Sequence, residues 1–225
     1  MSSKSSSSFL NSVMKKQFMG VSGLLLCGFV LTHLLGNLTL FVGSDAFNKY
    51  SYVLTSNPLI YLAEAGLLGI FLVHLYFAVT LILENRAARP VAYAYARKPS
   101  GRGATFASSS MPITGFLTLI FIVLHILSLK FGTHYETEVQ GVVMRDIYKT
   151  TIEYFQDPLH VLWYVIAVCS LGFHVSHGFW SAFQSLGWNH PKYMPKIKLA
   201  AYAFGLLVAV GFSTLAIFCY FQGGR

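Results

Sequence analysis

Cysteine is scarce in this sequence, and its three cysteines, Cys27, Cys169 and Cys219, each stand alone within an apolar run. No CxxC pair is present to hold a metal or an iron–sulfur cluster, and no CxxCH is present to attach a haem covalently. A GxGxxG motif is also absent, which excludes a dinucleotide site of the Rossmann kind. The chain by itself is therefore neither an iron–sulfur protein nor a dinucleotide-binding enzyme.

Charge is equally scarce. Only 11% of the 225 residues are charged and eight are acidic, whereas 55% are hydrophobic, which is typical of an integral membrane protein. A net charge of +8 could indicate nucleic-acid binding, but the positive residues form no dense basic run. We therefore predict contact with membrane lipid and no nucleic-acid partner.

Five apolar runs are each long enough to cross a bilayer as a helix, which needs about 20 residues. They cover residues 17–41, 59–83, 111–129, 159–186 and 197–221. Because open strands cannot satisfy their backbone in lipid, we predict an all-α protein, a single transmembrane domain over residues 1–225. The polar connection between the third and fourth runs is long enough to carry a short surface helix.

Positive residues gather on one side of the predicted membrane. Eleven of the sixteen Lys and Arg residues fall at the N-terminus or in the second and fourth connections, and five fall on the other side. The first set is Lys4, Lys15, Lys16, Arg86, Arg89, Arg97, Lys98, Arg102, Lys192, Lys196 and Lys198; the second is Lys49, Lys130, Arg145, Lys149 and Arg225. The positive-inside rule then predicts a cytoplasmic N-terminus and an external C-terminus.

Four histidines lie deep within the first four runs, one in each: His33, His74, His125 and His174. Ionisable groups inside a membrane are costly and usually functional. At 1.5 Å per residue, the histidines of the first and third helices lie about 24 and 21 Å from the cytoplasmic edge. Those of the second and fourth helices lie roughly 8 Å from that edge. Two histidine pairs at two depths are what two stacked b-type haems require, so we predict a four-helix haem-binding bundle.

A repeated spacing supports this interpretation. Ser22 and Gly23 precede His33 by the same intervals at which Thr114 and Gly115 precede His125. Eleven residues bring a helix back to nearly the same face, so the two hydroxyl residues should face the interior near the haem closer to the cytoplasm. The glycines would let a planar macrocycle approach the backbone, although small residues also serve ordinary helix packing.

Two further residues have open interpretations. His177, one turn after His174, competes as a ligand or could hydrogen-bond a haem propionate; the depth of His74 favours His174. Glu64 is the only carboxylate within a predicted span. It is either an uncharged, hydrogen-bonded acid or a catalytic proton-handling group at a quinone site, since quinone reduction consumes protons.

These residues resemble the single-chain, five-helix dihaem cytochrome b anchor of succinate dehydrogenases and fumarate reductases, the succinate:quinone oxidoreductases. The resemblance covers nearly the whole chain. It rests on the motifs Ser22–Gly23 to Thr32–His33–Leu34, on His74, on Ile113–Thr114–Gly115 to His125, and on Phe173–His174 followed by Gly178, Phe179, Trp180 and Ser181.

The resemblance implies that His33 and His125 bind the iron of the haem distant from the cytoplasm, and that His74 and His174 bind the near one. It implies a bacterial cytoplasmic membrane and a role in the respiratory chain and the tricarboxylic acid cycle. The partners would be an FAD-containing flavoprotein, which carries the dicarboxylate chemistry, an iron–sulfur subunit on the cytoplasmic side, and a quinone, with menaquinone favoured. Some fumarate reductase members carry a glutamate for proton movement where this chain has Gly172, which puts that route in doubt.

Two alternatives stay open from the sequence. The cytochrome b subunit of a hydrogenase or formate dehydrogenase also pairs histidines, but one ligand on each of four consecutive helices fits the succinate complexes better. A haem-free transporter or scaffold could use intramembrane histidines to bind protons or a metal. The direction of the reaction, succinate oxidation or fumarate reduction, does not follow from the residues.

Overall fold

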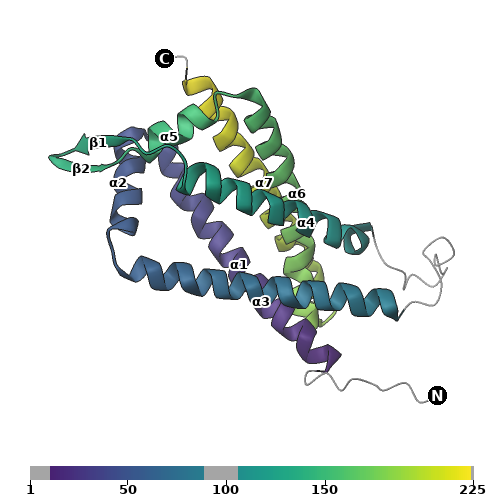
Figure 1. The fold of residues 1–225 in the computed structure, drawn as a ribbon. Helices are drawn as coiled ribbons and strands as arrows, with labels where there is room; N and C mark the ends of the chain where they lie inside the picture. The colour runs from purple at the N-terminus through teal and green to yellow at the C-terminus, as the bar shows by residue number, and fades with distance from the viewer. Residues whose placement is uncertain (1–10, 89–105, 224–225) are drawn as a thin grey trace.

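The computed structural model of the chain describes residues 11–88 and 106–223, with the side chains of residues 106 and 107 left out (Figure 1). The α-helices are α1 (Ser12–Asn37), α2 (Ser44–Thr55), α3 (Leu59–Ala87), α4 (Phe106–His125), α5 (Ile147–Tyr154), α6 (Pro158–Ser185) and α7 (Met194–Gln222). A 3-10 turn, η1 (Leu38–Phe41), follows α1, and a π-helical turn, η3 (Ile126–Lys130), follows α4. Strands β1 (Glu136–Val139) and β2 (Val142–Arg145) pair as an antiparallel hairpin.

All five predicted spans are confirmed. The described residues contain five helices long and apolar enough to cross a membrane: Ser12–Phe41, Leu59–Ala87, Ser108–Lys130, Pro158–Ser185 and Met194–Gln222. The chain is therefore a mostly helical, multi-pass membrane protein. The first helix begins five residues before the predicted run, because the Asn11 side chain accepts a 2.8 Å hydrogen bond from the Met14 amide and caps it.

Helices α1 and α6 form the centre of the bundle. They pack against each other, α3 packs on α1, and α4 and α7 pack on α6. The contact between α6 and α7 is the closest, because a Cβ added at Gly172 would lie 2.5 Å from the Gly205 carbonyl oxygen. Small residues let two membrane helices approach to backbone contact, which is where such helices gain their packing energy.

One end of the bundle carries α2, the hairpin and α5, and we call it the capped end; the opposite end, where α1 begins, is the N-terminal end (Figure 1). The surface helix expected between the third and fourth spans is present as α5. Helix α2 and the hairpin were not predicted. The hairpin has a two-residue turn in which Gln140 (φ 53°) and Gly141 (φ 80°) both take positive φ, as a type I′ turn requires.

A buried asparagine joins the parts of the capped end. Asn48 of α2 is 1% exposed, donates to Asp146 Oδ1 at 2.9 Å and accepts from the Tyr148 amide at 2.9 Å. Asp146 is also the N-cap of α5, accepting from the Lys149 amide. A buried polar group left without its partner costs about 1–3 kcal/mol of stability. Separating α2 from α5 would leave Asn48 and its partners unpaired, so this side chain holds α2 against the start of α5.

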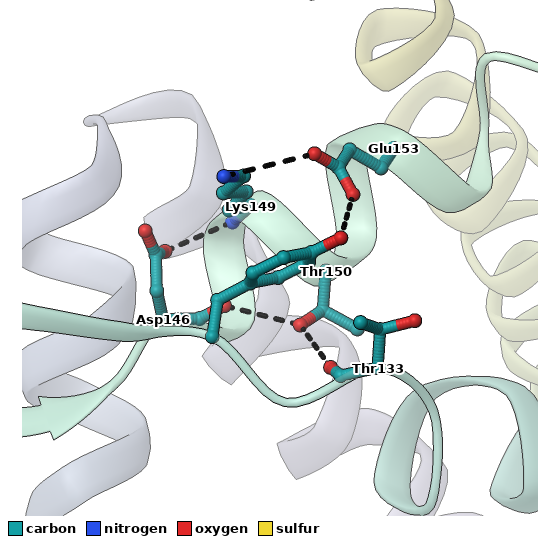
Figure 2. A network of polar contacts seen from close by, with 6 residues as sticks. Thr133, Asp146, Lys149, Thr150 and Glu153 are labelled. Carbon is teal, nitrogen blue, oxygen red and sulfur yellow. Dashed lines mark hydrogen bonds and ion pairs between the residues drawn. The ribbon is translucent and has the colours of Figure 1, made fainter.

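Figure 2 shows the polar network around α5, in which Thr150 Oγ1 donates to the Thr133 carbonyl oxygen at 2.9 Å. Lys149 and Glu153 form an ion pair one turn apart at 3.9 Å. Tyr135, in the loop before β1, donates to Glu153 Oε2 at 2.5 Å, and this hydrogen bond raises the pKa of Tyr135. These contacts connect the loop after η3 to α5.

Basic residues divide between the two ends as the sequence predicts, in so far as they are described. Lys15, Lys16, Arg86, Lys192, Lys196 and Lys198 belong to the N-terminal end, and Lys49, Lys130, Arg145 and Lys149 to the capped end. Lys4, Arg89, Arg97, Lys98, Arg102 and Arg225 lie outside the described residues. Lys15 is buried and ion-paired with Glu84, which joins α1 to α3 at the N-terminal end.

Candidate functional site

The capped-end pair consists of His33 on α1 and His125 on α4. Their ring centroids lie 5.8 Å apart, with planes at 87°. His125 is the last residue of α4 and immediately precedes the π-helical turn η3. Such turns occur frequently at functional sites. His33 is additionally stacked on Phe29, at 5.3 Å between centroids.

The N-terminal-end pair consists of His74 on α3 and His174 on α6. Their ring centroids lie 6.4 Å apart, with planes at 74°. The structure thus brings the four span histidines together in the two pairs that their depths predict. Each pair joins two helices that are not neighbours in the sequence.

The separation within each pair fits a metal ion placed between the two rings. A metal–nitrogen bond is about 2.0 Å long, and the centroid of an imidazole lies roughly 1.2 Å behind its nitrogen, so two imidazoles that held one metal ion would have their centroids at most about 6.3 Å apart. The observed 5.8 and 6.4 Å are close to this value. In the described ranges no group of three or more His, Cys, Asp or Glu side chains comes together. Two donors per pair fit a metal whose other positions are filled by a macrocycle.

Hydroxyl groups orient the imidazoles of the N-terminal-end pair. Ser22 Oγ lies 3.3 Å from His74 Nδ1, and its proton is directed to the Phe18 carbonyl oxygen at 2.7 Å. Because that proton is engaged within α1, the serine oxygen accepts from His74, which places the imidazole proton on Nδ1. Nε2 then keeps its lone pair and is free to bind a metal.

The same arrangement occurs between α4 and α6. Thr114 Oγ1 lies 3.1 Å from His174 Nδ1, and its proton is shared between the Ser110 and Met111 carbonyl oxygens, each at 3.2 Å. Both hydroxyl residues are buried. Ser22 and Thr114 therefore face the bundle interior, as their spacing predicts, and each contacts the histidine of a neighbouring helix.

The repeated glycines make room for the same imidazoles. A Cβ added at Gly23 would lie 3.3 Å from His74 Cε1, and one added at Gly115 would lie 3.3 Å from His174 Cε1. That separation is tighter than ordinary carbon contacts, so a side chain at either position would displace the ring. The space beside each glycine is taken by a histidine edge from the neighbouring helix.

Tyr164 of α6 was not singled out from the sequence. Its hydroxyl lies 3.2 Å from His125 Nδ1, and the side chain is 5% exposed. A tyrosine buried in an apolar span needs a hydrogen-bond partner for its hydroxyl, and this was the available signal. The position of Tyr164 in the sequence gave no signal of its contact with His125, because the two residues lie on different helices.

His177 is buried on α6, one turn beyond His174 toward the N-terminal end. Its ring meets the Trp180 ring edge to face at 4.9 Å. Within the described residues its Nδ1 has no hydrogen-bond partner. A buried ring nitrogen of this kind usually has a bound group or a water as its partner.

Glu64 of α3 is ion-paired with Lys130 of η3 at 2.5 Å, with both side chains about half exposed. From the sequence, Glu64 was either an uncharged, hydrogen-bonded acid or a proton-handling group at a quinone site. Its ion pair with Lys130 was not predicted. A polar cavity of about 200 Å³ also lies at the capped end, lined by Ser128, Thr133, Tyr135, Thr150, Glu153 and Tyr154.

Fold and site together define a multi-pass helical membrane protein in which two pairs of histidines face each other inside the bundle. No family model matches the chain, and no solved structure matches it. The chain is 28% identical over 158 residues to the succinate dehydrogenase cytochrome b558 subunit of Bacillus subtilis (strain 168), which covers 68% of this chain and 69% of that protein. This similarity supports the membrane-anchor family of succinate dehydrogenases.

Two of the three histidines of α6, His174 and His177, allow a matched test of the ligand assignment. We expect His174→Ala to lower the haem content of the purified chain by half, because the ring of His174 is paired with that of His74. His177→Ala, one turn away, should keep both haems. The pyridine haemochrome content per chain measures this; half the haem in His177→Ala with full haem in His174→Ala would reverse the assignment.

Proposed function

We propose that this chain is the dihaem cytochrome b subunit that anchors a succinate:quinone oxidoreductase in the bacterial cytoplasmic membrane. It carries electrons between an iron–sulfur subunit and membrane quinone. The observation that carries the proposal is the presence of two facing histidine pairs at two levels of one helical bundle. The similarity to a subunit named for cytochrome b558 in a succinate dehydrogenase supports it.

His33 and His125 would hold one haem b, and His74 and His174 the other. Bound between two imidazoles, each haem supplies one-electron transfer. The protein's part is to keep Nε2 of each histidine directed at the iron, which Ser22 and Thr114 do for the N-terminal-end pair through Nδ1. Nδ1 of His177, which has no hydrogen-bond partner in the described part of the chain, lies one turn from His174 and is suited to a haem propionate.

The N-terminal end would face the cytoplasm, because it carries most of the described basic residues. The flavoprotein and iron–sulfur subunits would bind there, next to the haem held by His74 and His174. The flavoprotein carries the dicarboxylate chemistry, since this chain has neither a dinucleotide motif nor paired cysteines. A basic surface also favours partners of opposite charge.

The quinone, for which menaquinone is favoured, would react at the capped end. Glu64 and its ion-pair partner Lys130 lie there, as does the polar cavity. Quinone reduction takes up protons as well as electrons, so a carboxylate at this level is suited to deliver them. We therefore assign Glu64 as the proton-handling group of the quinone reaction.

Succinate-driven reduction tests the proposed function. We expect the purified complex of this chain with its partner subunits to reduce its b-type haems and added menaquinone analogue when succinate is supplied. Optical spectroscopy follows haem reduction at the haem bands and quinone reduction in the ultraviolet. A complex that oxidises succinate with an artificial dye while its haems stay oxidised would contradict the proposal.

The role of Glu64 is tested by Glu64→Gln, which keeps the size of the side chain and removes its proton transfer. Loss of a general acid or base typically costs 10²–10⁴-fold, so we expect quinone turnover to fall about 10²-fold with an unchanged haem spectrum. Lys130→Gln is the matched control for the ion pair. Full turnover in Glu64→Gln with intact haems would remove the catalytic assignment.

A further inference from the structure

The environment of His125 differs from that of the other three histidines. His74 and His174 contact hydroxyls whose protons are held by their own helix backbone. His33 is packed against aromatic rings, Phe29 at 5.3 Å and Phe212 at 5.8 Å. His125 faces a phenol, with 3.2 Å between its Nδ1 and the hydroxyl oxygen of Tyr164.

The ring of Tyr164 is held in place from several sides. Its centroid lies 5.0 Å from that of Phe121, 5.6 Å from that of Tyr154 and 4.7 Å from that of Phe155, in edge-to-face arrangements. Phe121 belongs to α4, Tyr154 ends α5, and Phe155 is the residue after α5. Such packing fixes the direction of the hydroxyl, because a buried aromatic ring in contact on several sides has little rotamer freedom.

We propose that Tyr164 is a positioning residue that sets the reduction potential of the haem held by His33 and His125. The inference rests on the proposed function. With Nε2 bound to iron, the proton of His125 is on Nδ1 and is donated to the Tyr164 oxygen. A hydrogen bond of this kind makes the imidazole a stronger donor to the metal, which favours the oxidised, more positively charged iron.

The two haems can then be tuned separately. Thr114 acts on His174 of the N-terminal-end pair, and Tyr164 acts on His125 of the capped-end pair. Electron transfer between two sites depends on the difference between their potentials, so separate hydrogen bonds give the chain a means to set the direction of that difference. Tyr164 is on the same helix as His174, but its hydroxyl contacts His125 of the other pair and is also hydrogen-bonded to the Tyr154 side chain.

Tyr164→Phe removes the hydroxyl and keeps the ring. In a redox titration of the purified full chain we expect one of the two haem steps to become more positive. The ratio of reduced to oxidised haem at a fixed potential should rise about two- to tenfold, which corresponds to the loss of one ordinary hydrogen bond. The low-spin signal of the same haem should shift in electron paramagnetic resonance, while both haems are retained.

Thr114→Val is the matched variant, because it removes the hydroxyl that contacts His174 and keeps the shape of the side chain. It should shift the reduction potential of the haem held by His74 and His174. Phe155→Leu controls for packing around Tyr164, whose ring it contacts, and should leave both potentials in place. Unchanged potentials in Tyr164→Phe, a shift of the same step by Thr114→Val, or an equal shift or equal haem loss in Phe155→Leu would overturn the inference. A wild-type chain without two haems would instead contradict the proposed function.

Discussion

The arrangement of the bundle depends on one constraint: an imidazole buried among apolar helices needs a partner for each of its ring nitrogens. A polar group without a hydrogen-bond partner in the membrane costs roughly several kcal/mol of stability, so each histidine nitrogen needs a defined partner. Ser22 and Thr114 supply one for His74 and His174, and because their own protons bind backbone carbonyls they accept only. The remaining nitrogen of each of these two rings keeps its lone pair, as a metal ligand must. The proposed function rests on this arrangement and on the two facing histidine pairs.

The bundle is built from two similar halves. In each, a hydroxyl residue and a glycine on one helix receive the histidine of the next long helix, at Gly23 and at Gly115. Helix α7 contributes no histidine to either pair. It packs closely on α6 through Gly172 and Gly205, and its Phe212 lies against His33. A side chain at position 172 would collide with α7, because its Cβ would lie 2.5 Å from the Gly205 carbonyl oxygen.

The five spans and the pairing of the four histidines could be predicted from the sequence. A membrane fixes the length of each helix, so the depth of a residue follows from its position in the apolar run. Counting residues from the predicted edges placed His33 with His125 and His74 with His174. Contacts made across the fold could not be predicted. The Glu64–Lys130 pair joins two separate spans, Tyr164 contacts a histidine 39 positions away, and Asn48 binds α5 across about a hundred residues. Helix α2 was missed because it is short and lies outside the apolar runs.

The central claim is that the two histidine pairs each hold a haem, and the haem content of the purified wild-type chain tests it most directly. A reduced-minus-oxidised spectrum combined with a pyridine haemochrome assay should give a b-type band and two haems per chain, titrating in two steps. One haem per chain would show that one pair serves another purpose. A chain without a b-type band would contradict the account as a whole.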